Sequence, residues 1–508
     1  MPKVATQMPL SVVALDRRAE TPLFRQIYDS LRTAILQQRL APGFKLPSSR
    51  ELAVELKVSR NTVTAAFDQL AAEGYLVSRT GAGTFVSDAV PDEFQQPPKS
   101  ARPPSAAPDE TDRELSRRGK IISRTAAIFE YGSRVVRPFN PCLPNIQEFP
   151  YRIWARLAAR RLNRPNRSLQ GYGDPAGYEP LRREIAVYLG AARAVRCEPR
   201  QIIIVSGAQQ ALDLALRLLT DPGDAVWIEE PGNFGTRAAV TAAGARIVPV
   251  PVDEEGLDVE AGAALDARAR LVCVTPSHQY PLGVTMALKR RIELLKWANR
   301  TGSWILEDDY DSEYRYGSRP VASLQGLDAR GGRVIYIGTF SKVLSPALRL
   351  GYLVVPPPLI DSFTTAKAIL DRHSPIFEQM ILADFFAEGH FARHIRRMRE
   401  LYAERRELLK AAVRAAFGET VEIMPSEAGL HLTILLGDKS DDLAIARRAA
   451  ELGINLEPLS ALYTEEKNKK NGLVLGFASF SETEIREGAE KLAAVCREIQ
   501  SSGVSARP

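Results

Sequence analysis

A proline-rich stretch from Ala89 to Pro108 divides this sequence into two unequal parts. It reads AVPDEFQQPPKSARPPSAAP, in which the prolines remove backbone donors and favour extended chain while large apolar side chains are few. Such a stretch lacks the material for a packed core, and we interpret it as a linker. We therefore expect a small domain over residues 21–88, a linker over 89–112 and a large domain over 113–508.

The overall composition excludes several classes of protein and leaves the partners open. A net charge of +6 over 508 residues is too small to indicate nucleic acid by itself. The start of the chain lacks the apolar core of a signal peptide, and no stretch has the roughly 20 apolar residues that span a bilayer. The four cysteines lie far apart, so neither a disulfide framework nor a metal site is predicted; they are Cys142, Cys197, Cys273 and Cys496. We expect a cytoplasmic protein without contact to a membrane.

The small domain begins with two predicted helices. Thr21 and Pro22 suit a helix start, because threonine caps free amides and proline fits the first helical position. Ser48 and Glu51 form a Ser-x-x-Glu capping box at the start of a second, short helix.

A third helix and a hairpin follow directly. Ser59 is the predicted cap of a helix over residues 60–73, and Gly74 is its left-handed stop. Two short alternating strands, 75–79 and 84–87, are joined by a glycine-containing turn. Helix, turn, helix and hairpin together predict a winged helix-turn-helix.

In such a domain the start of the third helix lies in the major groove, where Arg60, Asn61 and Thr62 reach base edges. Arg50 at the start of the second helix is placed to contact a phosphate. The same trio of helices with a hairpin also serves in protein–protein modules. Net charge does not distinguish DNA binding from protein–protein binding here, since residues 1–88 hold eleven basic and eight acidic side chains.

The order of the helices and the hairpin distinguishes a DNA-binding domain from a protein–protein module. The run LPSSRELAVELKVSRNTVTAAFDQLAAEGYLVSRTGAGTFVS closely resembles the GntR family of winged-helix repressors. That resemblance implies binding to a double-stranded DNA operator, with contacts from the residues that match Arg50, Arg60, Thr62 and Gly83. The full set of residues predicted for the DNA interface is Arg50, Ser59, Arg60, Asn61, Thr62 and Gly83.

In the large domain, short apolar runs alternate with helical stretches, which predicts a mostly parallel sheet covered by helices. The predicted strands are 202–205, 226–229, 271–275, 304–307 and 334–338. Ligands of such sheets bind at the carboxyl ends of the strands, so polar residues just after each run are the candidates for chemistry.

Two of these strand ends carry groups that suit one cofactor. The stretch from Ser206 to Gln209 opens a helix after a strand, where glycine and free amides favour a phosphate. A carboxylate at Asp308 can keep the pyridine nitrogen of pyridoxal 5'-phosphate protonated, and the Tyr310 hydroxyl can bond the ring oxygen. Taken singly, the first is more often a helix cap and the second a solvated acidic loop.

A third strand end supplies an amine. Lys342 follows the strand 334–338, where a lysine shielded from water loses its proton more easily and can bond to an aldehyde. The guanidinium of Arg349 can clamp a phosphate together with the hydroxyls of Thr339 and Ser341. Alone, a lysine in a loop is usually an exposed charge.

Jointly, these groups resemble the fold-type I aminotransferases, over roughly residue 115 to the end of the chain. Motifs that carry the resemblance are YGDPAGYEPLR, SGAQQAL, EEPG, PSHQYPLG, EDDYDSEYRY and GTFSKVLSPALRLGY. It implies pyridoxal 5'-phosphate joined to Lys342, with Asp308 at the pyridine nitrogen and Tyr310 at the ring oxygen. The phosphate ligands it implies are Ala208, Gln209, Ser341 and Arg349, and Thr339 completes the predicted site.

A GntR-type domain fused to this fold is similar to the MocR/GabR-type regulators. The expected fold is therefore multi-domain, an α+β winged helix-turn-helix followed by an α/β fold-type I aminotransferase domain with a small C-terminal part. The resemblance also implies a homodimer, since pockets of this fold are typically completed by a partner subunit.

The sequence departs from ordinary aminotransferases at three positions. Val474 stands where many relatives carry an arginine that binds the substrate carboxylate. Asn233 replaces the aromatic residue that commonly stacks on the cofactor, and Gly235 replaces an effector-binding arginine of some relatives. Poor orientation of a substrate loses much of the rate that positioning provides. We expect a regulator that senses an amine or amino-acid-like effector, with weak or vestigial transamination; a working aminotransferase with a DNA-binding head is the alternative.

Overall fold

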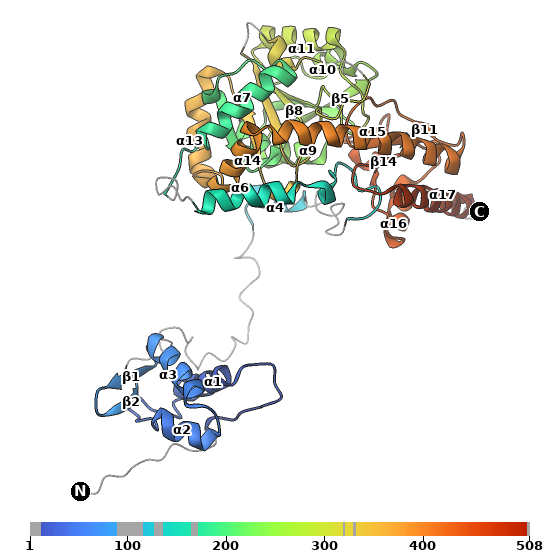
Figure 1. Cartoon of the computed structure of the whole chain (residues 1–508). Helices are drawn as coiled ribbons and strands as arrows, with labels where there is room; N and C mark the ends of the chain where they lie inside the picture. The colour runs from blue at the N-terminus through green and yellow to red at the C-terminus, as the bar shows by residue number, and fades with distance from the viewer. Residues whose placement is uncertain are drawn as a thin grey trace. The chain divides into compact units, whose positions relative to one another are not determined.

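The computed structural model forms two compact units, Met1–Glu114 and Leu115–Pro508 (Figure 1). The residues that it describes are 12–88, 115–125, 136–163, 171–317, 321–328 and 332–504. The predicted linker, 89–112, lies outside the described residues, and so does the start of the chain that was examined for a signal peptide.

The first unit has three helices and a two-stranded hairpin, as the sequence predicts. In chain order these are α1 (Leu23–Leu36), α2 (Ser49–Leu56), α3 (Arg60–Ala72), β1 (Leu76–Arg79) and β2 (Gly83–Val86). The two strands are antiparallel, with Leu76 opposite Val86 and Arg79 opposite Gly83. Apolar side chains from all three helices and the hairpin form one buried core, which includes Ile27, Leu31, Leu52, Val63, Leu70 and Val86.

The predicted caps hold for two helices and not for the first. The Ser48 hydroxyl accepts from the amide of Glu51, whose carboxylate accepts from the Ser48 amide, so the capping box is confirmed. The predicted cap by Thr21 is wrong, because α1 begins one residue later, with Pro22 as an N-cap that offers no side-chain bond. The carbonyl of Thr21 is occupied by the side-chain amide of Gln26, which holds the preceding turn outside the helix.

The second unit is built on an eight-stranded sheet in the order β3-β10-β9-β8-β7-β4-β5-β6. Its strands are β3 (Ile202–Val205), β4 (Ala225–Glu230), β5 (Arg246–Asp253), β6 (Gly256–Leu257), β7 (Leu271–Val274), β8 (Trp304–Asp309), β9 (Val334–Thr339) and β10 (Gly351–Val354). The five predicted strands are present and the pairs among β5, β4, β7, β8 and β9 are parallel, as expected. The antiparallel strand β10 between β3 and β9 was not predicted.

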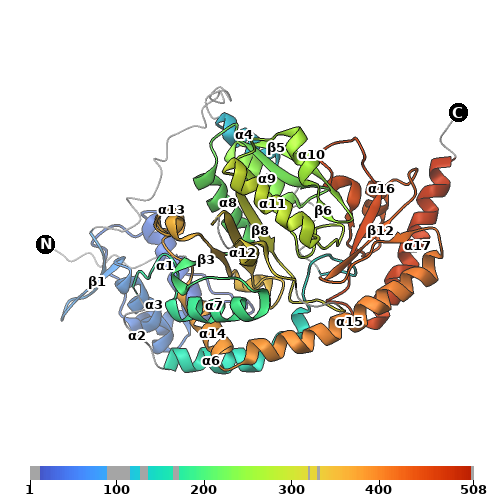
Figure 2. The ribbon, with the colours of Figure 1, turned by 90° about the horizontal axis from the view of Figure 1, so that it is seen from above.

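Helices cover both faces of this sheet (Figure 2). On β3, Ile203 and Val205 pack into one apolar cluster while Ile202 and Ile204 pack into another, because successive side chains of a strand point to opposite faces. The helices are α4 (Arg117–Arg124), α6 (Tyr151–Asn163), α7 (Glu179–Arg193), α8 (Ala208–Leu219), α9 (Phe234–Ala243), α10 (Val259–Leu265), α11 (Leu288–Thr301), α12 (Leu324–Leu327), α13 (Ile360–Asp371) and α14 (Ile376–Ala387). Among the described residues, no helix combines the length and the apolar character that crossing a membrane requires.

The long helix α15 (His390–Phe417) leads into a smaller C-terminal part, drawn in orange and red in Figure 2. There a four-stranded antiparallel sheet, β11-β12-β14-β13, packs against helices. Its elements are β11 (Glu422–Ile423), β12 (His431–Leu435), α16 (Asp442–Glu451), β13 (Glu457–Pro458), β14 (Gly472–Gly476) and α17 (Glu482–Val504). The small C-terminal part that the resemblance implies is confirmed.

A buried ion pair fixes the carboxyl end of β8. Nε of Arg193, the last residue of α7, lies 2.8 Å from Oδ2 of Asp309, and both side chains are almost completely buried. The same guanidinium donates to the hydroxyl of Ser277, and the Tyr336 hydroxyl donates to Asp309. Four separate segments therefore meet at the end of β8.

Replacing Arg193 tests how far the unit depends on that ion pair. Arg193→Met leaves the carboxylate of Asp309 buried without its cation, and we expect a loss of about 3–5 kcal/mol in the free energy of unfolding. The control is Arg486→Met, since the ion pair of Arg486 with Glu482 is exposed on both sides and is worth about 0–1 kcal/mol. Urea unfolding of the full chain measures both, and equal losses would contradict the prediction.

Candidate functional site

A cavity of about 430 Å³ opens where the strand ends of the large sheet face the smaller C-terminal part. All eight residues predicted for the cofactor site line it: Ala208, Gln209, Asp308, Tyr310, Thr339, Ser341, Lys342 and Arg349. They come from the ends of β3, β8 and β9 and from the segments that follow them. The structure thus gathers in one place groups that are up to 141 residues apart in the chain; their individual roles remain predictions.

One end of the cavity has the chemistry of an anion site. Gly207 is the N-cap of α8 and has no side chain to cap the first helical turn. Its φ of +125° suits glycine, and a Cβ at this position would lie 3.4 Å from Nη2 of Arg349. A helix start with free amides beside a guanidinium attracts a phosphate through both the dipole and the charge. The hydroxyl of Thr339, which accepts from the Ser341 amide, lines the same cavity.

Asp308 brings to the cavity a buried carboxylate oxygen, Oδ1, that has no hydrogen-bond partner among the described residues. The pKa of this carboxyl is raised to about 7, chiefly by burial and then by the neighbouring Asp309, against the lowering effect of the Lys342 ammonium. A buried acceptor without a donor is costly. A protonated pyridine nitrogen supplies the missing donor, so Asp308 fits the predicted cofactor.

Lys342 follows β9 and lines the cavity together with Asp308 and Cys142. Its positive charge offsets part of the effect of burial, which raises the pKa of the carboxyls of Asp308 and Glu457 and of the thiol of Cys142. Lys342 and Arg349 are the cationic residues among those that line the cavity. One cation therefore stands at the acidic side of the cavity and the other at the anion site.

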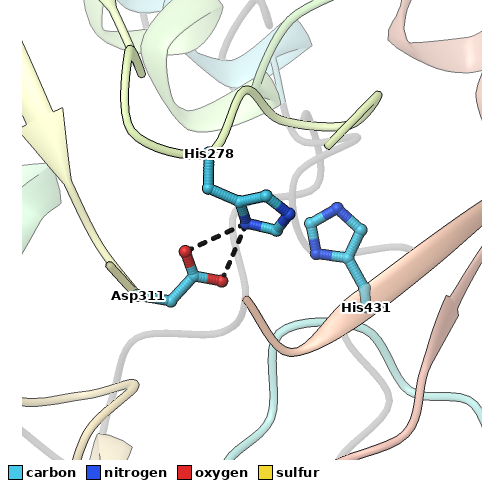
Figure 3. A group of neighbouring side chains, drawn as sticks. All are labelled: His278, Asp311 and His431. Carbon is cyan, nitrogen blue, oxygen red and sulfur yellow. Dashed lines mark hydrogen bonds and ion pairs between the residues drawn. The ribbon is translucent and has the colours of Figure 1, made fainter. Parts of the chain in front are cut away.

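Tyr310 is held by a hydrogen-bonded network behind the cavity. Its hydroxyl lies 3.1 Å from Nδ1 of His278, and that nitrogen lies 3.0 Å from Oδ1 of Asp311 (Figure 3). On the other side of the ring, Nε2 of His278 lies 3.2 Å from the Ser426 hydroxyl. Burial raises the pKa of Tyr310 well above its usual value, so the phenol stays protonated. His278 thus positions Tyr310, a contact that sequence reasoning missed.

His278, Asp311 and His431 lie close enough to hold a metal ion, and Figure 3 shows the two rings side by side. Each ring nitrogen, however, already has a protein partner. Nε2 of His431 contacts the Pro281 carbonyl at 3.2 Å, and its Nδ1 lies 3.7 Å from the sulfur of Cys142. Burial lowers the pKa of His431 well below its usual value. We interpret the group as a structural hydrogen-bond network.

The wall opposite the sheet was not predicted as part of the site. Tyr280, Asn455 and Glu457 line the cavity, the last two from the C-terminal part. The HQYP motif that contains Tyr280 is visible in the sequence, but its position in the site depends on contacts with β13. Asn233 and Gly235, two of the departures noted above, also line the cavity. Phe234 lies between them and carries the guanidinium of Arg237 over its ring at 4.4 Å.

In the N-terminal unit, four of the residues predicted for the DNA interface lie at the start of α3: Ser59, Arg60, Asn61 and Thr62. The Ser59 hydroxyl accepts from the Thr62 amide at 3.1 Å and so fixes the first turn. The side chains of Arg60 and Asn61 are exposed, as is that of Arg50 on α2. Nε of Arg60 lies 3.4 Å from the hydroxyl of Ser49, which links the two helices.

Gly83 begins the second strand of the hairpin in a left-handed conformation, with φ +115°. A Cβ there would lie 2.9 Å from Cε of Lys45, so the lysine packs across the glycine. The Lys45 ammonium also lies over the ring of Phe85. Lys45 is exposed beside the predicted wing, and sequence reasoning did not include it.

Both units match known families. The family model for aminotransferase class I and II matches residues 147–492, and that for bacterial regulatory proteins of the gntR family matches residues 23–86.

Individual relatives agree along the whole chain. The sequence is 40% identical over 492 residues to the probable rhizopine catabolism regulatory protein MocR of Rhizobium meliloti, over 97% of each chain. It is 32% identical to the HTH-type pyridoxine biosynthesis transcriptional regulator PdxR of Corynebacterium glutamicum, over 93% of this chain and 96% of that one. A similar solved structure is the α-aminoadipate aminotransferase LysN from Thermus thermophilus, complexed with N-(5'-phosphopyridoxyl)-L-leucine. It has a TM-score of 0.70 and 29% identity and covers 75% of this chain and 98% of its own.

The raised pKa of Asp308 predicts a pH-dependent stability of the cofactor-free protein. In the unfolded chain this carboxyl ionises near pH 4, whereas in the folded chain it does so at about pH 7. The folded state therefore loses stability as the pH rises from about 4 to about 7. We expect Asp308→Asn to be more stable than the wild type by about 1–3 kcal/mol at pH 8, and by less at pH 5. Thermal unfolding at the two pH values measures the difference; a gain that does not depend on pH would refute this prediction.

Proposed function

This chain belongs to the MocR-type transcriptional regulators, in which a gntR-family domain precedes a class I and II aminotransferase domain, and we propose that it controls operator binding through an amine that reacts at Lys342. In this proposal Lys342, Asp308, Tyr310 and Arg349 would hold pyridoxal 5'-phosphate, which would supply a carbonyl carbon that bonds reversibly to a primary amine with loss of water. Lys342 would be the amine that carries this carbon until an effector amine takes its place. The observation that carries the proposal is the unpartnered, buried carboxylate of Asp308 in the same cavity as that lysine.

Different residues of the cavity would hold different parts of the cofactor. The helix start at Ala208 and Gln209, with Ser341 and Arg349, would bind the phosphate. Asp308 would hold a proton on the pyridine nitrogen, and the Tyr310 hydroxyl would donate to the ring oxygen. In LysN the bound molecule is a phosphopyridoxyl amino acid, which supports a cofactor of this kind here.

An effector acts on DNA binding only if it binds one conformation of the protein better than another. Exchange of the lysine amine for the effector amine would free the Lys342 side chain in a cavity that Tyr280 and Glu457 also line. We propose that this change at the cavity wall biases the conformational equilibrium that the DNA-binding units sense.

The alternative, a working aminotransferase with a DNA-binding head, requires that a substrate carboxylate be clamped. Val474 is completely buried in an apolar cluster with Tyr280 and Tyr310 and offers no positive charge. Rapid, multiple-turnover transamination of a common amino acid would favour that alternative.

We further propose that the protein acts in the cytoplasm as a homodimer. Two gntR-type units would then contact two half-sites of one operator, and the symmetry of the protein would match that of the DNA.

The lysine is tested by the visible absorbance of the protein with pyridoxal 5'-phosphate. The wild type should show a band that a free aldehyde lacks, and Lys342→Ala should abolish it, because only a lysine–cofactor bond produces the band. Lys289→Ala is the control, since Lys289 lies on α11 with a 77% exposed side chain. A wild-type protein that remains colourless with excess cofactor would sink the proposal.

The DNA interface is tested by electrophoretic mobility shifts on duplexes selected from a random-sequence pool. Arg60→Ala should weaken binding by about 1–3 kcal/mol and relax the preference at one position. Arg50→Ala should weaken binding on all duplexes and lower the slope of log affinity against log salt by about one. Arg25→Ala is the control, because this exposed arginine pairs with Asp29 on α1. Equal effects of the three variants would argue against the predicted interface.

A further inference from the structure

The wall of the cavity opposite Lys342 carries a negative rather than a positive group. Val474 on β14 lies directly opposite Glu457 on β13 in the antiparallel pair. Facing side chains of such a pair are neighbours, so an arginine at residue 474 would neutralise Glu457. With valine there, the carboxylate of Glu457 bonds instead to the hydroxyl of Tyr280.

Glu457 and Tyr280 both line the cavity, and Tyr280 is part of an otherwise apolar cluster with Leu459 and Val474. The pKa of Glu457 is raised on balance by burial, and the Tyr280 hydroxyl and the charges of Lys342 and Arg237 offset only part of that effect. Arg237 is itself bound to the carbonyls of Tyr463 and Ala461 and does not line the cavity. The carboxylate therefore remains available to accept a further hydrogen bond.

An unpaired donor lies two residues from this acceptor. Asn455 lines the same cavity, and its buried amide nitrogen Nδ2 has no hydrogen-bond partner among the described residues. The chain runs from Asn455 through Leu456 to Glu457, and all three residues line the cavity. This part of the wall thus offers one donor and one acceptor to whatever fills the cavity.

We infer that the effector is a primary amine with a hydroxyl group at its far end and no carboxylate, and that Glu457 and Asn455 bind this hydroxyl. A hydroxyl donates one hydrogen bond and accepts others, so it satisfies both groups at once. A carboxylate would face the carboxylate of Glu457, and like charges at close range repel strongly where water is excluded. An ammonium would satisfy Glu457 and leave the amide of Asn455 without an acceptor. The inference rests on the function proposed above and names the chemical class of the effector.

The test uses matched amines of two, four and six carbons that end in a methyl, hydroxyl, ammonium or carboxylate group. Each is titrated into the cofactor-loaded protein, and the change in the visible band gives the half-saturating concentration. Within the best chain length, the amino alcohol should half-saturate the protein at a concentration about tenfold lower than the methyl-ended amine. The carboxylate-ended amine should need a higher concentration than the methyl-ended one.

Variants show whether Glu457 causes the preference for the amino alcohol over the carboxylate-ended amine. Glu457→Gln should bring the amino alcohol and the carboxylate-ended amine within about threefold of each other, because the amide removes the charge. Glu466→Gln is the control, since this glutamate is 89% exposed and does not line the cavity. Calorimetric titration of Lys342→Ala with the same amines measures recognition without the covalent step, and the same order of affinities is expected.

The outcomes separate this inference from the proposed function. If the wild type takes up no cofactor, the proposed function fails. If it takes up the cofactor but prefers the carboxylate-ended or the ammonium-ended amine, or does not distinguish the four, the assignment of a hydroxyl is overturned while the regulator proposal stands.

Discussion

The ion pair of Arg193 with Asp309 is the contact on which the geometry of the cavity depends. Adjacent residues of a strand point to opposite faces, so anchoring Asp309 on the side of α7 turns Asp308 toward the cavity. Three other segments join the anchor, through Ser277, Tyr336 and the helix that carries the arginine. A buried ion pair of this kind contributes little to the net free energy of unfolding, but burying one of its charges without the other lowers that free energy strongly. Both side chains are therefore needed together.

Sequence reasoning reached most of the fold because the features it uses are local. The apolar runs predict the five strands, and the Ser48 box predicts the start of α2, since each signal lies within a few residues. The strands β5 and β10 were missed, because β5 contains two prolines, which are rare inside strands, and β10 is only four residues long. An apolar run also does not show whether a strand is parallel or antiparallel to its neighbours. The cap at Thr21 was wrong by one residue: the Thr21 carbonyl accepts from the side chain of Gln26, and Pro22 is the N-cap of α1.

The residues of the candidate site also divide into those that local sequence patterns predict and those that depend on long-range contacts. Residues that follow strands directly, such as Asp308 and Lys342, were predicted because the topology of a parallel sheet brings strand ends together. Tyr280 and Glu457 were not, because they are 177 residues apart and meet only when the C-terminal sheet packs over the cavity. No short-range pattern reports such a contact. The consequence of Val474 likewise became visible only when the structure placed it opposite Glu457.

The charges around the cavity favour a sensor over a catalyst. Lys342 and Arg349 are the cationic residues among those that line the cavity, and we propose that both hold the cofactor. A second anionic group on the ligand would then find no cation of its own among the lining residues. An enzyme of α-amino acids gains much of its rate from orienting both ends of the substrate. A sensor needs only a difference in affinity between two conformations, which a hydrogen-bonding wall such as Glu457 and Asn455 can provide. In our proposal, the same wall that offers a carboxylate no cation would also let the protein discriminate among amines.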